Sequence, residues 1–156
     1  FNNQIYGMTG GQFSPMTPEG AQATTAPYGN IDRNFNLCGL TEAAGASFVA
    51  RGATYRPRQL ADIIEKALLH EGFSFVESFT QCPVRYGKLN ESTDPVEMLE
   101  VQKEQTANLN KWEKLSEEEK QKIYPLGILK EEVDPANEYT KRYEKIIEET
   151  LEKGVL

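Results

Sequence analysis

The stretch from residue 37 to residue 79 constrains the fold most strongly, because it alternates twice between a helical and a strand pattern. Residues 37–45 carry apolar side chains at helical spacing and end in a glycine, and residues 46–51 form a short apolar run typical of a buried strand. A second helix is predicted over 57–71, with a proline in its first turn, and a second strand over 73–79. Such close alternation favours right-handed crossovers. The sequence therefore predicts an α/β fold in which helices flank a parallel sheet.

The last third of the chain has a more charged and helical character. Asp94 is followed by a proline and an acidic first turn, and Ser116 begins a capping box, so each of them predicts a helix start. A brief apolar segment at 126–129 is either a strand or an extended stretch. Residues 139–151 carry an apolar stripe at helical spacing, which predicts a terminal amphipathic helix.

The net charge of −7 is distributed unevenly along the chain. Residues 1–90 carry 7 basic and 7 acidic side chains, whereas residues 91–156 carry 10 basic and 17 acidic ones. This balance disfavours general nucleic-acid binding, which needs a clustered basic surface. We expect residues 91–156 to form a helical, acidic C-terminal arm whose acidic face is solvated and which packs on the core or on another subunit.

The cysteines and the hydropathy pattern bear on the compartment in which the protein works. Cys38 and Cys82 lie in different sequence contexts, which argues against a disulfide framework and favours a reducing compartment. No segment resembles a signal peptide, and no apolar run is long enough to span a membrane. We therefore expect a cytoplasmic protein that has no membrane partner.

Residues 1–15 are chemically the most informative stretch of the chain. An apolar beginning leads into a run rich in glycine and hydroxyl groups, which is typical of a strand end that opens into a loop. The amide of Asn3 and the carbonyl of Ile5 offer neutral oxygens of the kind that Mg²⁺ binds together with phosphate oxygens. Residues 9–12 offer a hydroxyl and backbone N–H groups for an anion. On composition alone, a plain glycine-rich surface loop is an equally good interpretation.

The order of the residues in this stretch adds a resemblance to a known family. Residues 2–15 read Asn-Asn-Gln-Ile-Tyr-Gly-Met-Thr-Gly-Gly-Gln-Phe-Ser-Pro, with Thr-Pro at 17–18 and Pro-Tyr-Gly-Asn at 27–30. This string resembles the thiamine-diphosphate-binding β subunit of 2-oxoacid:ferredoxin oxidoreductases, especially the 2-oxoglutarate type. In that family the motif opens upstream with Gly-Asp-Gly, which this chain does not contain. The chain therefore resembles the C-terminal portion of such a subunit, with residues 1–90 as the C-terminal half of the thiamine-diphosphate-binding domain.

The resemblance implies roles for several residues of the opening loop. Asn3 and the backbone carbonyl of Ile5 are expected to coordinate Mg²⁺, and Thr9 is expected to face the diphosphate. Three further residues are expected to shape the wall near the thiazolium ring: Gly7, Met8 and Gly10. Gly7 belongs to the cofactor site, and the other two are the expected catalytic positions. Relatives differ at these two positions, so the choice of 2-oxoacid stays open.

Cys82 directly follows the predicted strand at 73–79, so its thiol should emerge at the loop edge of the sheet. On general grounds a single cysteine there is an ordinary small residue. The resemblance instead implies that Cys82 is the fourth thiolate of a [4Fe–4S] cluster whose other three ligands lie upstream. One thiolate cannot hold such a cluster by itself. Cys38 lies inside a helical pattern and is expected to serve in packing.

Other polar residues allow more than one interpretation. His70 lies at the expected C-terminal end of a helix, where a structural role is favoured over a catalytic one. Arg85, Lys88 and Asn90 follow Cys82 and suit an acidic electron carrier or an anionic substrate tail, or equally a solvated loop. Residues 14–36 form a long loop that the resemblance places near the cofactor and a partner subunit, and its hydroxyl groups are expected to cap local turns.

The resemblance implies an enzyme that oxidatively decarboxylates 2-oxoglutarate to succinyl-CoA and reduces ferredoxin. Its expected cofactors are thiamine diphosphate, Mg²⁺ and a [4Fe–4S] cluster. Its expected partners are the α subunit, further small subunits and ferredoxin, with a 2-oxoacid and CoA as substrates. Two alternatives stay open. The same chemistry could act on pyruvate or a branched-chain 2-oxoacid, or the isolated chain could be a non-catalytic α/β docking module.

Overall fold

The alternating pattern of residues 37–79 forms consecutive helices and strands in the structure, a computed structural model that describes residues 1–90, 93–133 and 138–154. The elements are α1 (Leu37–Ala43), β1 (Phe48–Ala53), α2 (Pro57–Leu69) and β2 (Ser74–Phe79). β1 and β2 pair in parallel along their full length. The predicted helix-strand-helix-strand order is therefore confirmed.

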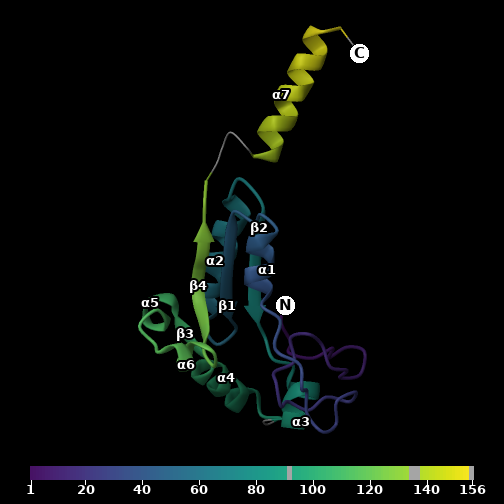
Figure 1. The fold of residues 1–156 in the computed structure, drawn as a ribbon, viewed down its shortest axis with the longest axis vertical. Helices are drawn as coiled ribbons and strands as arrows, with labels where there is room; N and C mark the ends of the chain where they lie inside the picture. The colour runs from purple at the N-terminus through teal and green to yellow at the C-terminus, as the bar shows by residue number, and fades with distance from the viewer. Residues whose placement is uncertain (91–92, 134–137, 155–156) are drawn as a thin grey trace.

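The sheet contains four strands in the order β2-β1-β4-β3. The apolar segment at 126–129 lies within β4 (Tyr124–Glu131), which pairs antiparallel with β1. The short strand β3 (Thr106–Asn108) pairs in parallel with β4. The predicted α/β class is confirmed, and the sheet as a whole is mixed. The reason is that the chain enters β4 from the edge at which β1 and β2 end, without a crossover helix (Figure 1).

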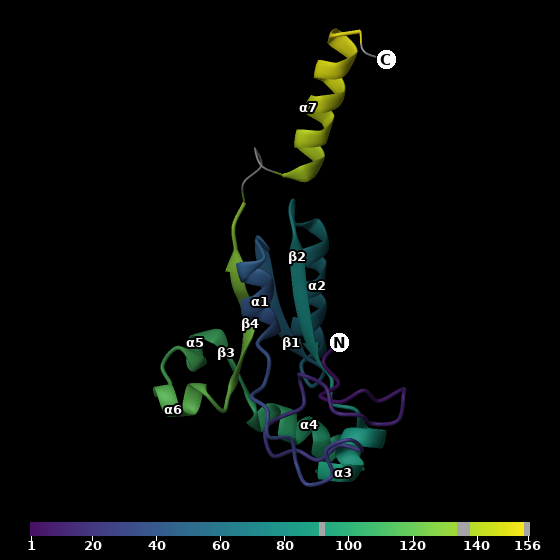
Figure 2. The same cartoon turned by 45° about the vertical axis from the view of Figure 1, so that its right-hand side comes forward.

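β1 is buried along its whole length because α1 and α2 cover opposite faces of the sheet (Figure 2). Successive side chains of a strand point to opposite faces. Accordingly, Val49 packs with Cys38 of α1, and Phe48 and Ala50 pack with Ile63 of α2. The packing role expected for Cys38 is confirmed.

The remaining helices lie before and after β3 and β4: η1 (Pro83–Gly87), α3 (Lys88–Asn90), α4 (Pro95–Glu104), α5 (Leu109–Trp112), α6 (Glu117–Lys120) and α7 (Tyr139–Glu152). The predicted helix starts are confirmed, since the Asp94 side chain accepts from Val96 N–H at 2.8 Å and Ser116 forms a capping box with Glu119. Two strands of this region belong to the sheet, so a purely helical arm is not confirmed. The expected domain boundary borders residues 91–92, which lie outside the described residues, and it stays a prediction.

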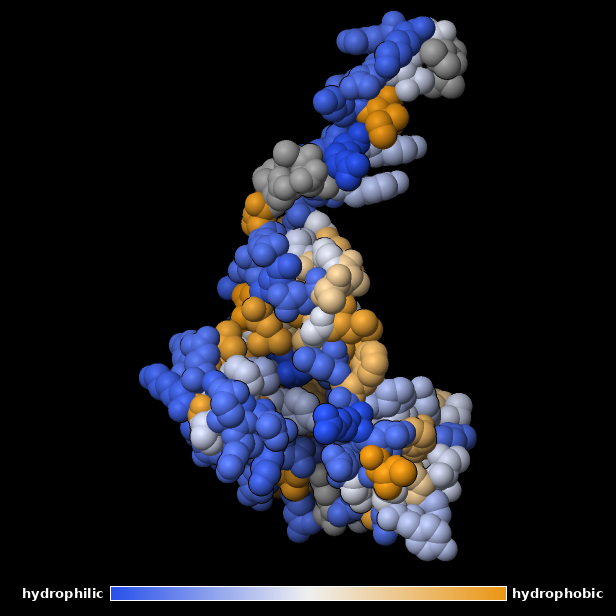
Figure 3. All heavy atoms as spheres, in the orientation of Figure 1, coloured by the Kyte–Doolittle hydropathy of each residue, from blue (hydrophilic) through white to orange (hydrophobic). Residues whose placement is uncertain are grey.

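The last helix, α7, projects away from the sheet (Figures 1 and 2). Lys141 of α7 forms an ion pair with Glu71, which follows α2. The surface over α5 and α6 is hydrophilic (Figure 3). Among the described residues, no helix has the length and apolar character needed to cross a bilayer.

Candidate functional site

The opening loop begins where the parallel strands end. Asn2 forms a parallel bridge with Phe79, the last residue of β2. The backbone then continues this pairing, because Thr80 N–H donates to the Asn2 carbonyl at 3.0 Å and Cys82 N–H donates to the Asn3 carbonyl at 3.2 Å. The loop and the Cys82 segment therefore lie together at the carboxyl edge of the sheet, as predicted, which is where α/β sheets bind ligands.

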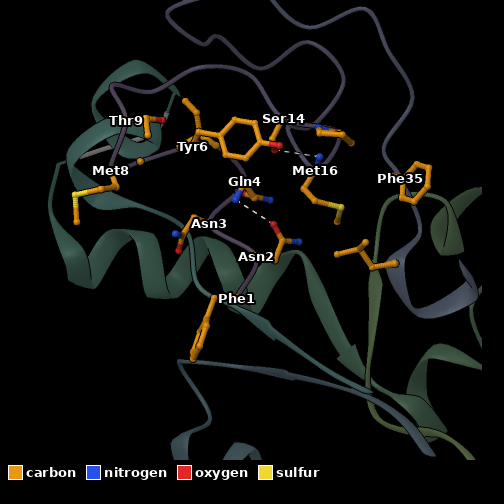
Figure 4. Close-up of a pocket in the computed structure, with 14 residues that line it drawn as sticks. Phe1, Asn2, Asn3, Gln4, Tyr6, Met8, Thr9, Ser14, Met16 and Phe35 are labelled. Carbon is orange, nitrogen blue, oxygen red and sulfur yellow. Dashed lines mark hydrogen bonds between the residues drawn. The ribbon is translucent and has the colours of Figure 1, made fainter. Parts of the chain in front are cut away.

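The loop lines a pocket of about 470 Å³ (Figure 4). Its wall consists of residues 1–9 and 14–16, together with Phe35, which precedes α1, and Leu37, the first residue of α1. Most of the candidate residues line this pocket: Asn3, Ile5, Gly7, Met8 and Thr9. Gly10 belongs to the same turn but does not line the pocket. The structure therefore gathers five of the six loop candidates around one cavity.

The candidate metal ligands are two neutral oxygens on either side of Gln4. Asn3 is exposed, and its Oδ1 accepts a hydrogen bond from Thr80 Oγ1 at 2.8 Å. The Ile5 side chain is buried in an apolar cluster. Within the described parts of the chain, no hydrogen bond is donated to the Ile5 carbonyl oxygen. A free carbonyl beside an exposed amide oxygen fits a small hard cation.

The turn that follows is closed by its own backbone. Tyr6 N–H donates to the Gln12 carbonyl at 3.0 Å, and Gly11 N–H donates to the Tyr6 carbonyl at 2.8 Å. Gly10 and Gly11 have φ angles of 126° and 88°, which side-chain-bearing residues rarely adopt. The Thr9 hydroxyl donates to Gln12 Oε1 at 2.7 Å. Met8 and Thr9 are exposed, Gly7 and Gly10 are half-buried, and Gly11 is buried. The exposed part of this turn, with the Thr9 hydroxyl, fits an anionic group such as a diphosphate.

The segment after β2 packs against the back of the turn. A Cβ atom on Gly7 would lie 2.8 Å from Cys82 Sγ, and one on Gly11 would lie 3.3 Å from Arg85 Cδ. The Cys82 thiol therefore faces the loop backbone, and the stem of Arg85 lies against the glycine turn. Asn90 has a structural role, since its Nδ2 donates to the Gln22 carbonyl at 2.9 Å. Lys88, in α3, is exposed to solvent.

The cysteines and the histidine differ in their surroundings. Both cysteines are free thiols, Cys82 half-buried and Cys38 buried. Burial raises the pKa of Cys38 to about 12, so this thiol stays protonated. Among the residues that the structure describes, no three His, Cys, Asp or Glu side chains gather as a metal site. His70 caps the C-terminal end of α2 and hydrogen-bonds Ser47 at 2.8 Å, which agrees with the expected structural role.

Comparisons with known proteins identify the family. The sequence model described as "Thiamine pyrophosphate enzyme, C-terminal TPP binding domain" matches residues 1–78. The chain belongs to this family. Thiamine pyrophosphate (TPP) is another name for thiamine diphosphate, so the pocket of this TPP-binding domain lies within the matched part of the chain.

Several relatives extend the similarity beyond the matched domain. The 2-oxoglutarate synthase subunit KorB of Methanocaldococcus jannaschii is 51% identical over 118 residues, which cover 76% of this chain and 44% of the relative. The KorB subunit of Archaeoglobus fulgidus is 41% identical over 145 residues, which cover 93% of this chain and 50% of the relative. The chain thus spans about half the length of the curated relatives it matches.

A solved structure has the same fold as this TPP-binding domain. It is 2-oxoglutarate:ferredoxin oxidoreductase from Magnetococcus marinus with 2-oxoglutarate, coenzyme A and succinyl-CoA bound. The TM-score is 0.70 at 23% sequence identity, and the match covers 93% of this chain and 50% of that chain. The arrangement of helices and strands is therefore shared well beyond residue 90.

Sequence reasoning missed several residues that build the site of this TPP-binding domain. Asn2 Nδ2 donates to Glu77 Oε1 at 2.7 Å, and Arg51 Nε donates to Glu77 Oε2 at 2.7 Å. Gln4 is buried in the pocket at a φ of 59°, and both polar atoms of its side chain lack a partner among the described residues. The available signal was the presence of an arginine and a glutamate inside two apolar strands.

The loop at 14–36 packs against the opening loop and forms hydrogen bonds with its backbone. Thr17 is fully buried, and its Oγ1 donates to the Gln4 carbonyl at 2.6 Å. Ser14 N–H in turn donates to Thr17 Oγ1 at 2.9 Å. Phe13 N–H donates to Thr25 Oγ1 at 3.0 Å. These hydroxyl groups serve local turns and contacts between the two loops, as expected.

Proposed function

We propose that the chain is the TPP-binding part of the β subunit of a 2-oxoglutarate:ferredoxin oxidoreductase, which oxidatively decarboxylates 2-oxoglutarate to succinyl-CoA. One observation carries the proposal. The exposed Asn3 amide and the glycine turn lie beside the Ile5 carbonyl, to which no described residue donates a hydrogen bond, in a chain that is 51% identical over 118 residues to a 2-oxoglutarate synthase subunit. The similar solved enzyme has 2-oxoglutarate and CoA bound.

The proposed Mg²⁺ ligands are Asn3 Oδ1 and the Ile5 carbonyl oxygen. Thr80 Oγ1 donates to Asn3 Oδ1, which fixes the orientation of the amide and leaves a second lone pair on its oxygen. Mg²⁺ completes its coordination with phosphate oxygens and water. This chain therefore provides neutral ligands that need a diphosphate to balance the charge of the cation.

The proposed diphosphate contacts come from the turn that follows. The Thr9 hydroxyl, which donates to Gln12 Oε1 in this structure, would donate to a phosphate oxygen instead, and the Gly7 backbone would lie beside the cofactor. When bound, thiamine diphosphate supplies the electron sink for decarboxylation of a 2-oxoacid. Met8, which is 98% exposed, and Gly10 are the proposed catalytic positions, which would shape the wall near the thiazolium ring.

Cys82 is proposed as one thiolate of a [4Fe–4S] cluster. A cluster needs four thiolates. The described residues provide a single thiol at this edge, because Cys38 is buried between α1 and the sheet. The chain by itself therefore does not fit a cluster, and we assign no electron-transfer step to it. The proposed complex supplies the other three thiolates of the cluster. Its other protein partners are the α subunit and ferredoxin, and we propose that it is cytoplasmic.

Calorimetric titration of the assembled complex with thiamine diphosphate at fixed Mg²⁺ tests the proposed site. We expect Asn3→Ala to weaken binding by about 10-fold or more, since metal-site substitutions typically cost about 10- to 100-fold in affinity. The matched control is Asn110→Ala on α5, where an exposed asparagine lies outside the pocket. Equal affinities for the two variants would contradict the assignment. A wild-type complex that binds no cofactor would instead favour a non-catalytic docking module.

The substrate is tested separately by the reduction of an artificial electron acceptor by the complex. Each 2-oxoacid is supplied with CoA, and the initial rates are compared for 2-oxoglutarate, pyruvate and a branched-chain acid. We expect the highest kcat/KM for 2-oxoglutarate. A preference for another acid would retain the cofactor chemistry and overturn the substrate assignment.

A further inference from the structure

A buried ion pair lies under the opening loop. Arg51 of β1 and Glu77 of β2 are opposite each other in the parallel register, and Arg51 Nε lies 2.7 Å from Glu77 Oε2. The two residues are only 4% and 2% exposed. Burying two charges costs desolvation energy, and well-packed apolar side chains would stabilise a fold at least as well. The pair therefore calls for an explanation other than stability.

The second oxygen of Glu77 reaches the candidate site through Asn2. Glu77 Oε1 accepts from Asn2 Nδ2 at 2.7 Å. A carboxylate can only accept hydrogen bonds, so it determines which end of the Asn2 amide points toward the sheet. The amide oxygen is then left to accept from Gln4 N–H, at 3.0 Å. Asn2 is itself only 4% exposed, so solvent does not compete for these bonds.

The hydrogen-bond chain from Glu77 through Asn2, which we call the relay, ends at the backbone of Gln4. Gln4 has a φ of 59°, a left-handed backbone conformation that a residue with a side chain rarely adopts. Its backbone is held on both sides, since its N–H is bound by Asn2 and its carbonyl accepts from Thr17 Oγ1 at 2.6 Å. The left-handed conformation at Gln4 sets the relative directions of the Asn3 amide and the Ile5 carbonyl, because it lies between them.

We propose that Glu77, with its charge balanced by Arg51, is a positioning residue for the cation and diphosphate site. It acts through Asn2 and the backbone of Gln4, and it touches no ligand itself. The inference rests on the proposed function, which assigns Asn3 and Ile5 as cation ligands. A carboxylate suits this task because it offers two acceptor oxygens. Oε2 accepts from the guanidinium of Arg51 and from the Cys38 thiol, and Oε1 accepts from the amide of Asn2.

The test exchanges the donor and acceptor between Asn2 and Glu77. In Glu77→Gln the new amide oxygen is expected to face the Arg51 donor, so its NH2 group faces Asn2. The Asn2 amide must then turn its oxygen toward residue 77, and it loses its bond to Gln4 N–H. In the double variant Asn2→Asp/Glu77→Gln, the residue at 77 donates to a carboxylate at position 2, which can still accept from Gln4. The double variant also keeps the net charge of the wild type.

The first readout is the affinity of the assembled complex for its ligands. Calorimetry measures the binding of thiamine diphosphate, and electron paramagnetic resonance measures the binding of Mn²⁺. We expect Glu77→Gln to weaken binding about 10- to 100-fold, as is usual for groups that orient metal ligands. The double variant should recover most of this loss. The control Glu71→Gln, which removes the exposed partner of Lys141, should bind as the wild type does. An unchanged affinity in Glu77→Gln, or a double variant no better than the single one, would overturn the proposal.

The second readout is hydrogen exchange at the Gln4 amide, which needs no cofactor. Exchange should become faster in Glu77→Gln and return toward the wild-type rate in the double variant. If the wild-type complex binds no thiamine diphosphate, the proposed function is wrong. Unchanged hydrogen exchange in Glu77→Gln would reject the positioning role of Glu77, whatever the cofactor result. If Glu77→Gln does not fold, Asn2→Ala, which retains the Arg51 pair, must show the faster exchange or the proposal is wrong.

Discussion

At the scale of single residues, the candidate site depends on places where a side chain would not fit. Gly7 lies so close to Cys82 that a Cβ atom would be 2.8 Å from the sulfur. The contact joins the loop before the first helix to the segment after β2. The position of the turn and the position of the thiol are thus coupled.

A double-mutant cycle tests this coupling. Gly7→Ala should destabilise the fold by about 1–3 kcal/mol, because overpacking forces the backbone or Cys82 to move. Cys82→Ala removes the sulfur, so the double variant should lose less stability than the sum of the single variants. Urea unfolding of all four proteins measures the free energies. Strictly additive costs would show that the two residues do not press on each other.

The two thiols should react at very different rates. Burial raises the pKa of Cys38 to about 12, and the thiolate is the reactive form, so Cys38 should resist alkylation from neutral to mildly alkaline pH. Cys82 is half-buried at the loop edge and should be modified first. Peptide mass analysis after brief treatment with iodoacetamide locates the label. In denaturant both cysteines should react, and preferential labelling of Cys38 in the native protein would contradict its observed burial.

At the scale of secondary-structure elements, loop segments are fixed to the sheet by contacts between distant parts of the chain. Thr17 holds the Gln4 carbonyl, and Asn90 of α3 holds the Gln22 carbonyl. The long loop at 14–36 is therefore anchored on both the opening loop and the segment after Cys82. In contrast, α7 presents an apolar stripe with exposed side chains: Tyr139, Tyr143, Ile146, Ile147 and Leu151.

The start of α7 should depend on pH. Hydrogen bonds from the backbone N–H groups of Thr140 and Lys141 lower the pKa of Glu138, the N-cap residue. Because the folded pKa is depressed, the stabilisation is present above the ordinary pKa of a glutamate and is lost as the pH falls through the folded pKa. Helicity of α7, followed by NMR chemical shifts down to about pH 2, should therefore decline in acid.

The matched control is Glu138→Gln, which weakens this cap at all pH values. The variant should show lower helicity than the wild type at neutral pH, and the two proteins should converge in acid. Parallel curves over the whole range would mean that the Glu138 carboxylate does not cap the helix.

At the scale of the whole molecule, β4 holds the sheet together. It lies between β1 and β3, and its residue Leu126 is 1% exposed. An exposed ion pair between Lys141 and Glu71 connects α7 to the rest of the chain. Exposed ion pairs contribute little to stability.

Two truncations should therefore have opposite outcomes. A chain ending at Val133 loses α7 and should keep the unfolding free energy of the core within about 1 kcal/mol. A chain ending at Ile123 also loses β4, which exposes one edge of β1, and should not fold cooperatively. Circular dichroism and urea unfolding distinguish the two. A large loss of stability in the first truncation would show that α7 supports the core.

Much of the fold was predictable because its signals are local. The alternation over 37–79 and the caps at Asp94 and Ser116 depend on neighbouring residues, and the structure confirms them. The apolar run at 126–129 predicted extended structure, but no local pattern states which strand it joins. Its antiparallel place beside β1 follows from the edge at which the chain enters the sheet.

The candidate site divides in the same way. The order of amides, glycines and hydroxyls at 2–15 is local information, and it was enough to indicate the family and the chemistry that the loop can offer. Three features of the site depend on the folded chain: Asn2 donates to Glu77, Gln4 is buried in a left-handed conformation, and Cys82 faces Gly7. Such contacts join residues up to 75 positions apart, and they form only when the parallel strands and their loops pack, which no periodicity along the chain encodes.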